Sequence, residues 1–497
     1  MSLQIKLVNQ VVPSDLLGVF VASEQLAEQI KQLPVQVVDL AETLADQDFK
    51  GQVSGSACIR LTGQSAKYLV LAGLGKAKNG VLSVESLRRA TAKLVRASEC
   101  RNAKSLTIVL PEAILFGITD AQLLEQVVTV AKIANHKFDT YLTDNSKKER
   151  QIELSLVVPV GAGDLSAGLA KAELVANATN QTRQWVDTPA NHFTPAILAD
   201  HAQKIARETG LKATVFGGDQ IEQMGFGGIH AVARGSVQEG RMILLEYTCG
   251  DVSAPTIALV GKGITYDTGG LSIKPANSME TMKDDMAGAA AVISTMEVLA
   301  KLKPKVNVVG CAPAAENMPS GSAGRPGDII TFYNGKTAEV KNTDAEGRLI
   351  LADGLSYVTK HYKLAAVVDI ATLTGACEYA LGTFFAGLVS EHDDLAGQVA
   401  AAGMQAGEPV WRLPLTDDYK SSMKSEIADL SNISSGRFKC GTITGAVFLQ
   451  NFVGDVPWVH IDIANVAYDL GMLPYYRSDS ATGFGVRLLV EFALNFK

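Results

Sequence analysis

The chain has 497 residues, more than the roughly 250–300 that one hydrophobic core usually serves, so we expect two domains. Apolar residues make up 47% and charged residues 20% of the chain, which excludes a disordered composition. The net charge of −7, without a block of Lys and Arg, argues against a dedicated nucleic-acid binder. A local basic patch is still compatible with this composition.

The ends and cysteines of the chain indicate its compartment. The first ten residues have no basic start followed by a continuous apolar stretch, so they do not resemble a secretory signal. No apolar span is long enough for a transmembrane helix, so we predict no membrane association. The six cysteines include no C-x-x-C pair, which is typical of free thiols in a reducing compartment. We therefore expect a cytoplasmic protein.

The first part of the chain alternates apolar and helical stretches. Residues Tyr68–Gly73 and Ser105–Leu110 have the pattern of buried strands, and Val84–Ser98 has helical spacing. This alternation predicts an N-terminal α/β domain over residues 1–164. It contains no cluster of candidate ligands, so its role is left open.

Residues 165–186 form a long helical stretch that ends near Thr188, because a residue before proline disfavours the helical conformation. We interpret residues 165–187 as a helix that connects the N-terminal domain to a C-terminal domain over residues 188–497. The strand candidates of this second domain are Met242–Tyr247, Thr256–Val260, Val306–Cys311, Ala365–Ile370 and Trp458–Ile463.

These strand candidates are apolar throughout, as expected when both faces of a sheet are covered. Helices are predicted between them, including Met282–Leu302 and Gly347–Thr359. We therefore predict an α/β fold of two domains. The smaller is N-terminal, and the larger, C-terminal domain has a central mixed sheet covered by helices.

Candidate chemistry first appears after the strand Thr256–Val260. This strand ends at Gly261 in a glycine-rich loop, and ligands of open α/β sheets bind beyond the carboxyl ends of strands. Lys262, Asp267 and Lys274 follow directly. Further on, Asp284 and Asp285 begin an apolar helix. An alternative interpretation of these two carboxylates is stabilisation by the helix dipole alone.

The second candidate segment is NTDAEGRL, at residues 342–349. It holds Asp344, Glu346 and Arg348 within five residues; a solvated turn with an internal salt bridge is the alternative interpretation. Three or four converging carboxylates repel one another unless cations neutralise them. Oxygen-rich sites suit divalent ions, and two close ions suit hydrolysis of an acyl or phosphoryl bond. Spacing alone therefore indicates a dinuclear metal hydrolase.

Taken together, these segments resemble the leucyl aminopeptidase family over roughly residues 186–497. The octapeptide NTDAEGRL carries the resemblance. The flanking blocks that agree are GKGITYDTGG, SIKP, MKDDMAGAA, ENMPSGSAGRPGD, ATLTGA and WVHIDIAN. The resemblance implies a metal-dependent aminopeptidase that releases leucine and other, mostly apolar, residues from peptide N-termini by attack of a metal-bridging water.

The resemblance also implies a ligand set for two divalent ions, Mn²⁺ or Zn²⁺. One ion is assigned to Lys262, Asp267, Asp285 and Glu346. The second is assigned to Asp267, Glu346 and Asp344, the last also through its carbonyl group. Lysine must bind as the neutral amine, so the metal has to displace its proton.

Two side chains are implied to be catalytic. Lys274 donates to the oxyanion, and Arg348 holds a bicarbonate ion that serves as general base. Backbone groups that help to hold this ion are those of Ala345, Gly347 and Leu373. The pocket for the first side chain of the substrate is lined by Met282, Thr372 and Gly375.

The implied partners are peptides with a free N-terminus and further copies of this chain in a homohexamer. Three rival functions are a DNA-binding regulator, a two-metal phosphoester hydrolase and a catalytically inactive scaffold. The intact Lys274 and Arg348 argue against the scaffold, and the net charge argues against the regulator.

Overall fold

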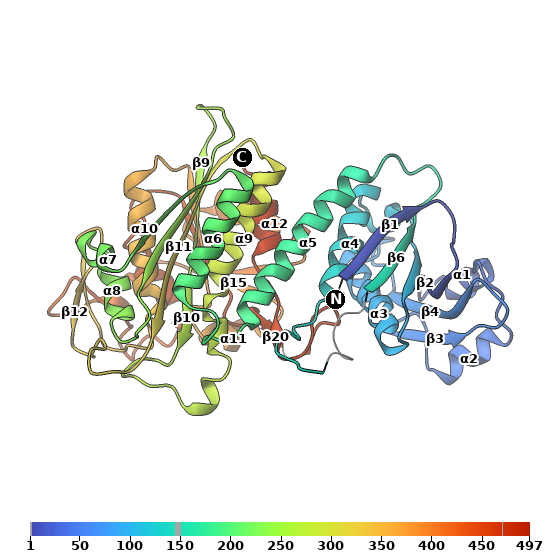
Figure 1. Cartoon of the computed structure of the whole chain (residues 1–497), viewed down its shortest axis with the longest axis horizontal. Helices are drawn as coiled ribbons and strands as arrows, with labels where there is room; N and C mark the ends of the chain where they lie inside the picture. The colour runs from blue at the N-terminus through green and yellow to red at the C-terminus, as the bar shows by residue number, and fades with distance from the viewer. Residues whose placement is uncertain (1, 145–150, 470) are drawn as a thin grey trace. The chain divides into compact units, whose positions relative to one another are not determined.

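The computed structural model describes residues 2–144, 151–469 and 471–497. The chain forms two compact units, which we describe separately (Figure 1). Unit 1 comprises Met1–Asn180 and Leu470–Asp479, and unit 2 comprises Gln181–Asp469 and Ser480–Lys497. Helix α5, Ser166–Asp187, contains the boundary. No pattern in the sequence indicated that residues near the end of the chain belong to unit 1.

Unit 1 is built on a six-stranded sheet in the order β1-β6-β5-β2-β4-β3. All neighbouring strands are parallel except β3 and β4. The two strands predicted in this part of the chain are confirmed as β4 and β5. The strands are β1 (Ser2–Val8), β2 (Ser14–Ala22), β3 (Ser56–Arg60), β4 (Ala66–Gly75), β5 (Ser105–Val109) and β6 (Gln151–Val157).

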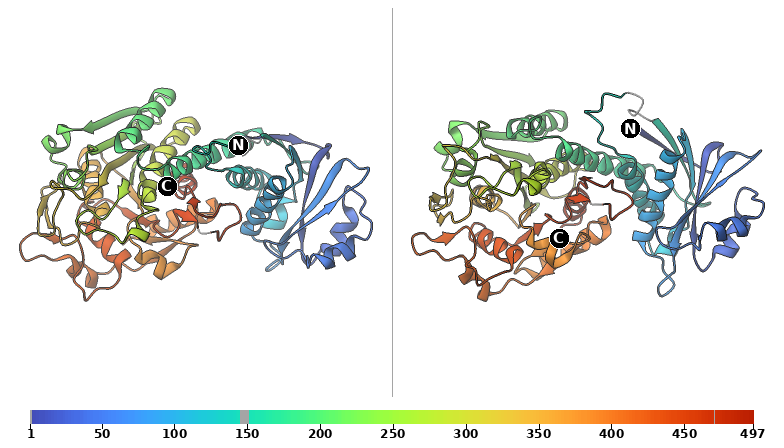
Figure 2. Two further views of the ribbon diagram at one scale, coloured as in Figure 1. Left: turned by 60° about the horizontal axis from the view of Figure 1, so that its bottom comes forward. Right: turned by 90° about the horizontal axis from the view of Figure 1, so that it is seen from below.

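Helices cover both faces of this sheet (Figure 2). One core contains residues of α3 (Val84–Cys100) and α4 (Asp120–Asn135), and a second core on the other face contains residues of α2 (Leu40–Asp46). The predicted helix at residues 84–98 is thus confirmed as α3. Helix α4 begins with a capping box in which the side chains of Thr119 and Gln122 bond each other's backbone N–H groups.

Unit 2 contains a nine-stranded mixed sheet, in the order β16-β15-β18-β14-β9-β11-β8-β7 with β10 paired to β11. Strands β18, β14, β9 and β11 are parallel, whereas β8 and β15 run antiparallel to their neighbours β11 and β18. The strands are β7 (Lys212–Gly217), β8 (Arg241–Tyr247), β9 (Thr256–Gly261), β10 (Gly263–Asp267), β11 (Asn307–Asn317), β14 (Ala366–Ala371), β15 (Ala386–Val389), β16 (Val410–Leu413) and β18 (Trp458–Asp462).

Two hydrophobic cores lie on the two faces of this sheet. Every residue of β14 and β18 is buried, which explains why these strands are mostly apolar on both sides; the exceptions are Asp369, His460 and Asp462. The helices of one face are α6 (Pro195–Thr209), α9 (Ala287–Leu302), α12 (Asp393–Ala406) and α15 (Val486–Leu494). Those of the other face are α7 (Asp219–Gln223), α8 (Gly227–Ala233), α10 (Gly347–His361) and α14 (Gly441–Gln450). The predicted two-domain α/β fold with a mixed sheet is therefore confirmed.

Short elements complete unit 2. A three-stranded sheet joins β12 (Ile329–Thr331), β13 (Thr337–Glu339) and β17 (Leu430–Ser431), and β19 (Tyr468–Asp469) pairs with β20 (Ser480–Ala481). Helices α11 (Ala376–Leu381) and α13 (Asp417–Lys420) are short, with six and four residues. Among the described residues, no helix is both long and apolar enough to cross a membrane.

Two local predictions around the candidate site were wrong. The segment after Gly261 is not a loop throughout, because Gly263–Asp267 forms β10. Strand β11 is longer than β9, so its far end at Ala314–Asn317 is free to pair with β10. Asp285 does not begin the long helix either: it lies in the 3-10 turn η5 (Met282–Met286), directly before α9.

A buried carboxylate ties three elements of unit 2 together. Asp353 of α10 is completely buried and accepts hydrogen bonds from the backbone N–H groups of Ile229 in α8 (2.9 Å) and Tyr333 after β12 (3.0 Å). Burial raises the pKa of Asp353 to about 7, although these backbone donors lower it. Because the folded pKa lies above the ordinary 3.8, protonation favours the folded state.

We therefore expect the contribution of Asp353 to stability to be fully present below its unfolded pKa and to be lost as the pH rises through about 7. The side chain of Asp353→Asn does not titrate. Relative to this variant, the free energy of unfolding of the wild type should fall by on the order of a few kcal/mol as the pH rises from the unfolded pKa of Asp353 to above 7. Urea unfolding of both proteins at about pH 5 and about pH 8 measures the difference. Asp429→Asn, at an exposed carboxylate, is the control. If the free energies of unfolding of the wild type and Asp353→Asn differed by the same amount at both pH values, the interpretation would be contradicted.

Candidate metal centre

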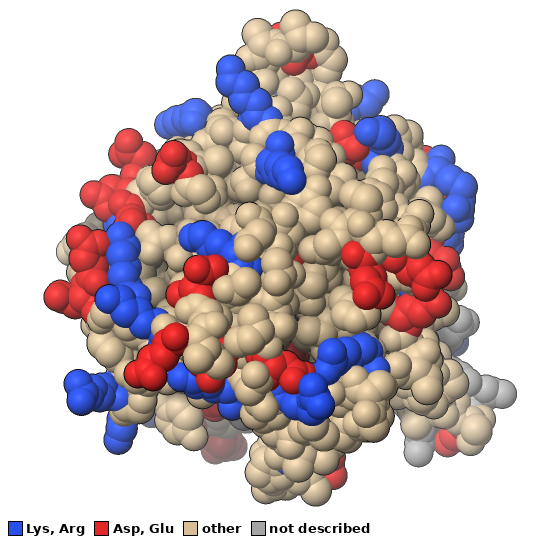
Figure 3. Space-filling model, turned by 90° about the vertical axis from the view of Figure 1, so that its left-hand side faces the viewer, with Lys and Arg blue, Asp and Glu red and all other residues tan. Residues whose placement is uncertain are grey.

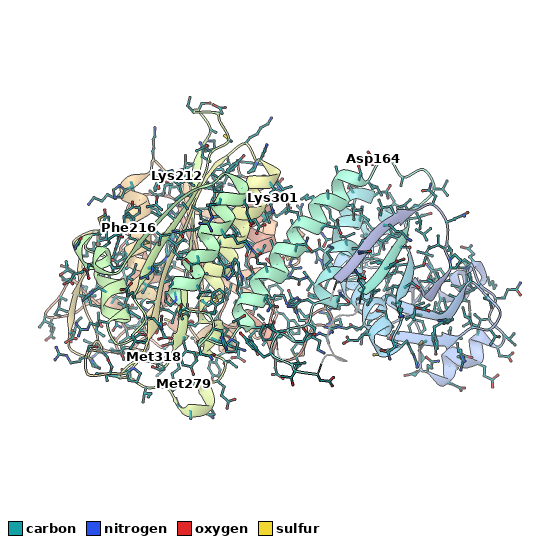
Figure 4. The ribbon with its side chains drawn as sticks, in the orientation of Figure 1. Asp164, Lys212, Phe216, Met279, Lys301 and Met318 are labelled. Carbon is teal, nitrogen blue, oxygen red and sulfur yellow. The ribbon has the colours of Figure 1, made fainter. Side chains whose placement is uncertain are left out.

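The predicted site residues lie where the parallel strands of unit 2 end. Lys262 follows β9, Asp267 closes β10 and Thr372 follows β14. Figure 4 shows Met318, directly after β11, toward one end of unit 2, and Lys212, the first residue of β7, toward the other. The carboxyl edge of an open α/β sheet is the usual position of a ligand site.

Lys262 draws two carboxylates of this edge together. Its Nζ atom is 2.6 Å from Asp285 Oδ1 and 2.9 Å from Glu346 Oε1. It also donates to the carbonyl of Thr372 at 2.7 Å, and the Thr372 hydroxyl donates to Asp285 Oδ1 at 2.8 Å. Any side chain at position 347 would clash with Lys262, since a Cβ on Gly347 would come within 2.4 Å of Lys262 Cε.

Lys274 draws the other two carboxylates together. Its Nζ atom is 2.9 Å from Asp267 Oδ2 and 2.7 Å from Asp344 Oδ1. Lys274 lies in the loop after β10, and its side chain keeps 16% exposure, whereas Asp267 is buried. The structure thus brings all five predicted metal ligands and Lys274 into one cluster, although they come from three separate stretches of chain, around residues 262–274, 285 and 344–346.

The donor set of this cluster suits divalent cations. Ligand atoms of Asp267, Asp344 and Glu346 all lie within 4.8 Å of one another. The second carboxylate oxygens, Asp285 Oδ2 and Glu346 Oε2, are buried without a hydrogen-bond partner among the described residues. Four carboxylates face two ammonium groups, so the cluster keeps a net charge of −2 (2 − 4). Oxygen ligands in this number fit hard divalent ions.

Burial and charge shift the pKa values of this cluster. Burial raises the pKa of Asp285, and the nearby charges of Glu346 and Asp267 raise it further, against the effect of Lys262. Burial also raises the pKa values of Asp267 and Asp344. For Lys262 burial lowers the pKa, but the three carboxylates around it raise it more. Such strong mutual perturbation of titratable groups is typical of functional sites.

Arg348 lies in the first turn of α10 and is buried. It donates through Nη1 to the carbonyl of Asn432 at 2.8 Å, and its Nε has no hydrogen-bond partner among the described residues. Burial lowers the pKa of Arg348 to about 10, while Glu346 and Asp462 raise it. The guanidinium therefore has donor capacity for an anion.

The residues implied to help Arg348 lie on two loops. Ala345 and Gly347 flank Glu346, with Gly347 as the first residue of α10, and Leu373 lies two residues after β14. The Leu373 N–H donates to Asp462 Oδ1 at 3.1 Å. The Ala345 N–H donates to the Asn342 carbonyl at 3.3 Å, so the N–H groups of both Leu373 and Ala345 already have an acceptor within the protein.

The three implied substrate residues occupy different places around the cluster. Met282 begins η5, Thr372 contacts Lys262 and Asp285, and Gly375 is exposed before α11. A Cβ placed on Gly375 would meet no atom within 4 Å. Open space at Gly375 fits a position that borders a substrate pocket.

Two residues of the site were not predicted. Asn317, at the end of β11, donates to Asp267 Oδ1 at 2.8 Å and to the Thr343 carbonyl at 3.1 Å. Asp462, at the end of β18, also accepts from the hydroxyl of Thr374 at 2.6 Å. Both lie in sequence blocks noted above, ENMPSGSAGRPGD and WVHIDIAN, which were the available signals. Each fixes a loop that carries predicted site residues.

A carboxylate-rich cluster at the carboxyl edge of a mixed α/β sheet is typical of a metal-dependent hydrolase. The model of the cytosol aminopeptidase family, catalytic domain, matches residues 180–490, and the model of its N-terminal domain matches residues 16–145. The chain belongs to the cytosol aminopeptidase family. Membership implies a metal-dependent aminopeptidase and confirms the resemblance found in the sequence.

Relatives span nearly the whole chain. Two are probable cytosol aminopeptidases, from Koribacter versatilis (40% identical, covering 92% of this chain and 91% of the relative) and from Roseiflexus castenholzii (41% identical, 93% of each). A solved structure, the bottromycin maturation enzyme BotP, is 33% identical with a TM-score of 0.84, covering 97% of this chain and 99% of BotP. BotP has also been solved in complex with Mn, with the same TM-score, identity and coverage.

Proposed function

We propose that this chain is a dinuclear-metal leucyl aminopeptidase, releasing leucine and other mostly apolar residues from peptide N-termini. The observation that carries this proposal is the cluster of Asp267, Asp285, Asp344 and Glu346 around two lysines. Four converging carboxylates exceed the charge that the two lysines neutralise, and two of their buried oxygens have no partner among the described residues.

Two divalent ions, Mn²⁺ or Zn²⁺, would be held by Lys262, Asp267, Asp285, Asp344 and Glu346. The Mn complex of BotP supports manganese as one candidate. When bound, such ions supply an acidified water and polarise the scissile carbonyl. By the family resemblance, Asp267 and Glu346 would be ligands of both ions; their ligand atoms and that of Asp344 all lie within 4.8 Å of one another.

The protein side chains have separate proposed roles. Lys274, which is partly exposed beside Asp344, donates to the developing oxyanion of the substrate. Arg348 holds bicarbonate as general base, with the backbone of Ala345, Gly347 and Leu373. Met282, Thr372 and Gly375 border the pocket for the first side chain.

Family membership also supports a cytoplasmic homohexamer as a proposal. The surface charge bears on the rival function of nucleic-acid binding. Figure 3 shows the end of unit 2 that carries α7, α8 and β12. Acidic and basic side chains are interspersed over this face, rather than forming the single-signed basic surface of a nucleic-acid binder.

We expect a leucyl peptide with a free N-terminus to be hydrolysed and its N-acetylated form to be left intact. Acetylation removes both the charge and the lone pair of the α-amine, which is the proposed anchor of the substrate. Product analysis with Mn²⁺ or Zn²⁺ measures this, and an aryl phosphate ester tests the rival phosphoester hydrolase. Equal turnover of blocked and unblocked peptides would refute an aminopeptidase, and preferential hydrolysis of the ester would favour the rival.

A further inference from the structure

A cavity of about 370 Å³ lies in unit 2 between α8, the end of β11 and β12. None of the predicted catalytic, metal or substrate residues lines it. Its volume is near the lower end of the range for small-molecule sites, which suits a small metabolite rather than a polymer. Asn317 and Thr343 line it, and the same Asn317 donates to Asp267, so the cavity adjoins the surroundings of the metal centre.

The charged groups of this cavity do not balance. Arg234 and Arg325 both pair with Asp328, at 2.8 Å and 2.9 Å. Asp328 is the one acidic side chain among the described lining residues, so two guanidinium groups share one carboxylate and leave a net charge of +1 (2 − 1). In addition, Arg234 Nε is buried and has no hydrogen-bond partner among the described residues. A buried donor without an acceptor is costly, and the Arg234 side chain as a whole keeps 35% exposure, so its guanidinium can still reach an anion in the cavity.

The rest of the lining contains a strongly apolar part. Val232, Ile330, Val340 and Leu349 are buried residues of the core beneath α8 and α10, and all four line the cavity. Burial of an aliphatic group against them would be favourable. A ligand that matches the whole lining therefore combines a negative charge with an aliphatic group.

We propose that this cavity binds a small branched aliphatic carboxylate, with its carboxylate at Arg234 and its aliphatic group against Ile330 and Val340. A free amino acid such as leucine has this chemistry, and so does a simple carboxylic acid without an amine. The amino acid is the source we favour, with its ammonium group at Asp328, the acidic side chain of the described lining. The choice of the amino acid rests on the proposed function, because an aminopeptidase releases free amino acids. The proposal that the cavity binds a carboxylate does not rest on that function.

The test is calorimetric titration of the metal-loaded full chain with 4-methylpentanoate. We expect one site per chain and no binding of the uncharged 4-methylpentanamide. Arg234→Gln should weaken binding at least about tenfold, because it removes a charged hydrogen-bond donor. Asp328→Asn should tighten binding, because the arginines lose their competing carboxylate. Arg241→Gln, at an arginine that pairs with Glu239 and does not line the cavity, should change nothing.

The opposite signs of the two variants separate ligand binding from damage to the fold. If Arg234→Gln and Asp328→Asn both left the affinity unchanged, or both weakened it, the proposed site would be refuted. If inorganic phosphate bound as tightly as 4-methylpentanoate, the proposed contact of an aliphatic group with Ile330 and Val340 would be refuted. Weaker binding of L-leucine than of 4-methylpentanoate would refute the amino acid as the source. A peptidase assay on the same samples shows separately whether the proposed function fails.

Discussion

Lys274→Ala is expected to lower kcat by on the order of 10²–10³, the typical loss for one oxyanion donor, with both metals retained. The metals stay because Lys274 neutralises Asp267 and Asp344 in the present structure, at 2.9 and 2.7 Å. Its removal leaves these carboxylates with more unbalanced negative charge, which favours cations. The measurements are kcat on a leucyl amide and metal content by elemental analysis.

Two further variants make the Lys274 result specific. Lys274→Arg keeps the charge but not the shape of the ammonium group, so it should recover only part of kcat. Lys341→Ala, at a half-exposed lysine that pairs with Glu339 at 3.4 Å, should behave like the wild type. Loss of metal from Lys274→Ala, with kcat per bound metal unchanged, would show that Lys274 acts on the metal site and not on the reacting carbonyl.

Glu346→Ala should lose metal together with activity. Glu346 is almost completely buried, its Oε1 contacts Lys262 at 2.9 Å, and its Oε2 is buried without a partner among the described residues. As a proposed ligand of both ions it affects affinity directly, so the loss should exceed the 10–100-fold typical of outer-shell changes. Elemental analysis after dialysis, and activity as Mn²⁺ or Zn²⁺ is added back, measure both effects.

The isosteric Glu346→Gln distinguishes charge from packing. It keeps the volume of the side chain while removing its charge, so it should also bind metal weakly although the fold is intact. Glu339→Ala, a partly buried carboxylate beside Lys341, is the control that should keep its metals. Full metal occupancy in both Glu346 variants would overturn the ligand assignment, even if activity were lost.

Much of the site was predictable because its parts are local in sequence. Asp344, Glu346 and Arg348 lie within five residues at the start of a helix, and Lys262 directly follows an apolar strand. A continuous apolar strand implies a covered sheet, and the end of such a strand implies a ligand site. The sequence by itself therefore determined the α/β class, the main strands and helices, and the polar residues that the structure brings together in one cluster.

Only the tertiary structure decided how distant segments meet. β10 forms because β11 extends beyond β9, and Asp267 is held by Asn317, fifty positions away. The carbonyl of Asn432 and the carboxylate of Asp462 act from still more distant loops. Strand order and register fix these hydrogen bonds, and a single sequence shows neither. For the same reason the cavity beside Arg234, which is lined by residues from 227 to 349, has no signature in any one stretch of chain.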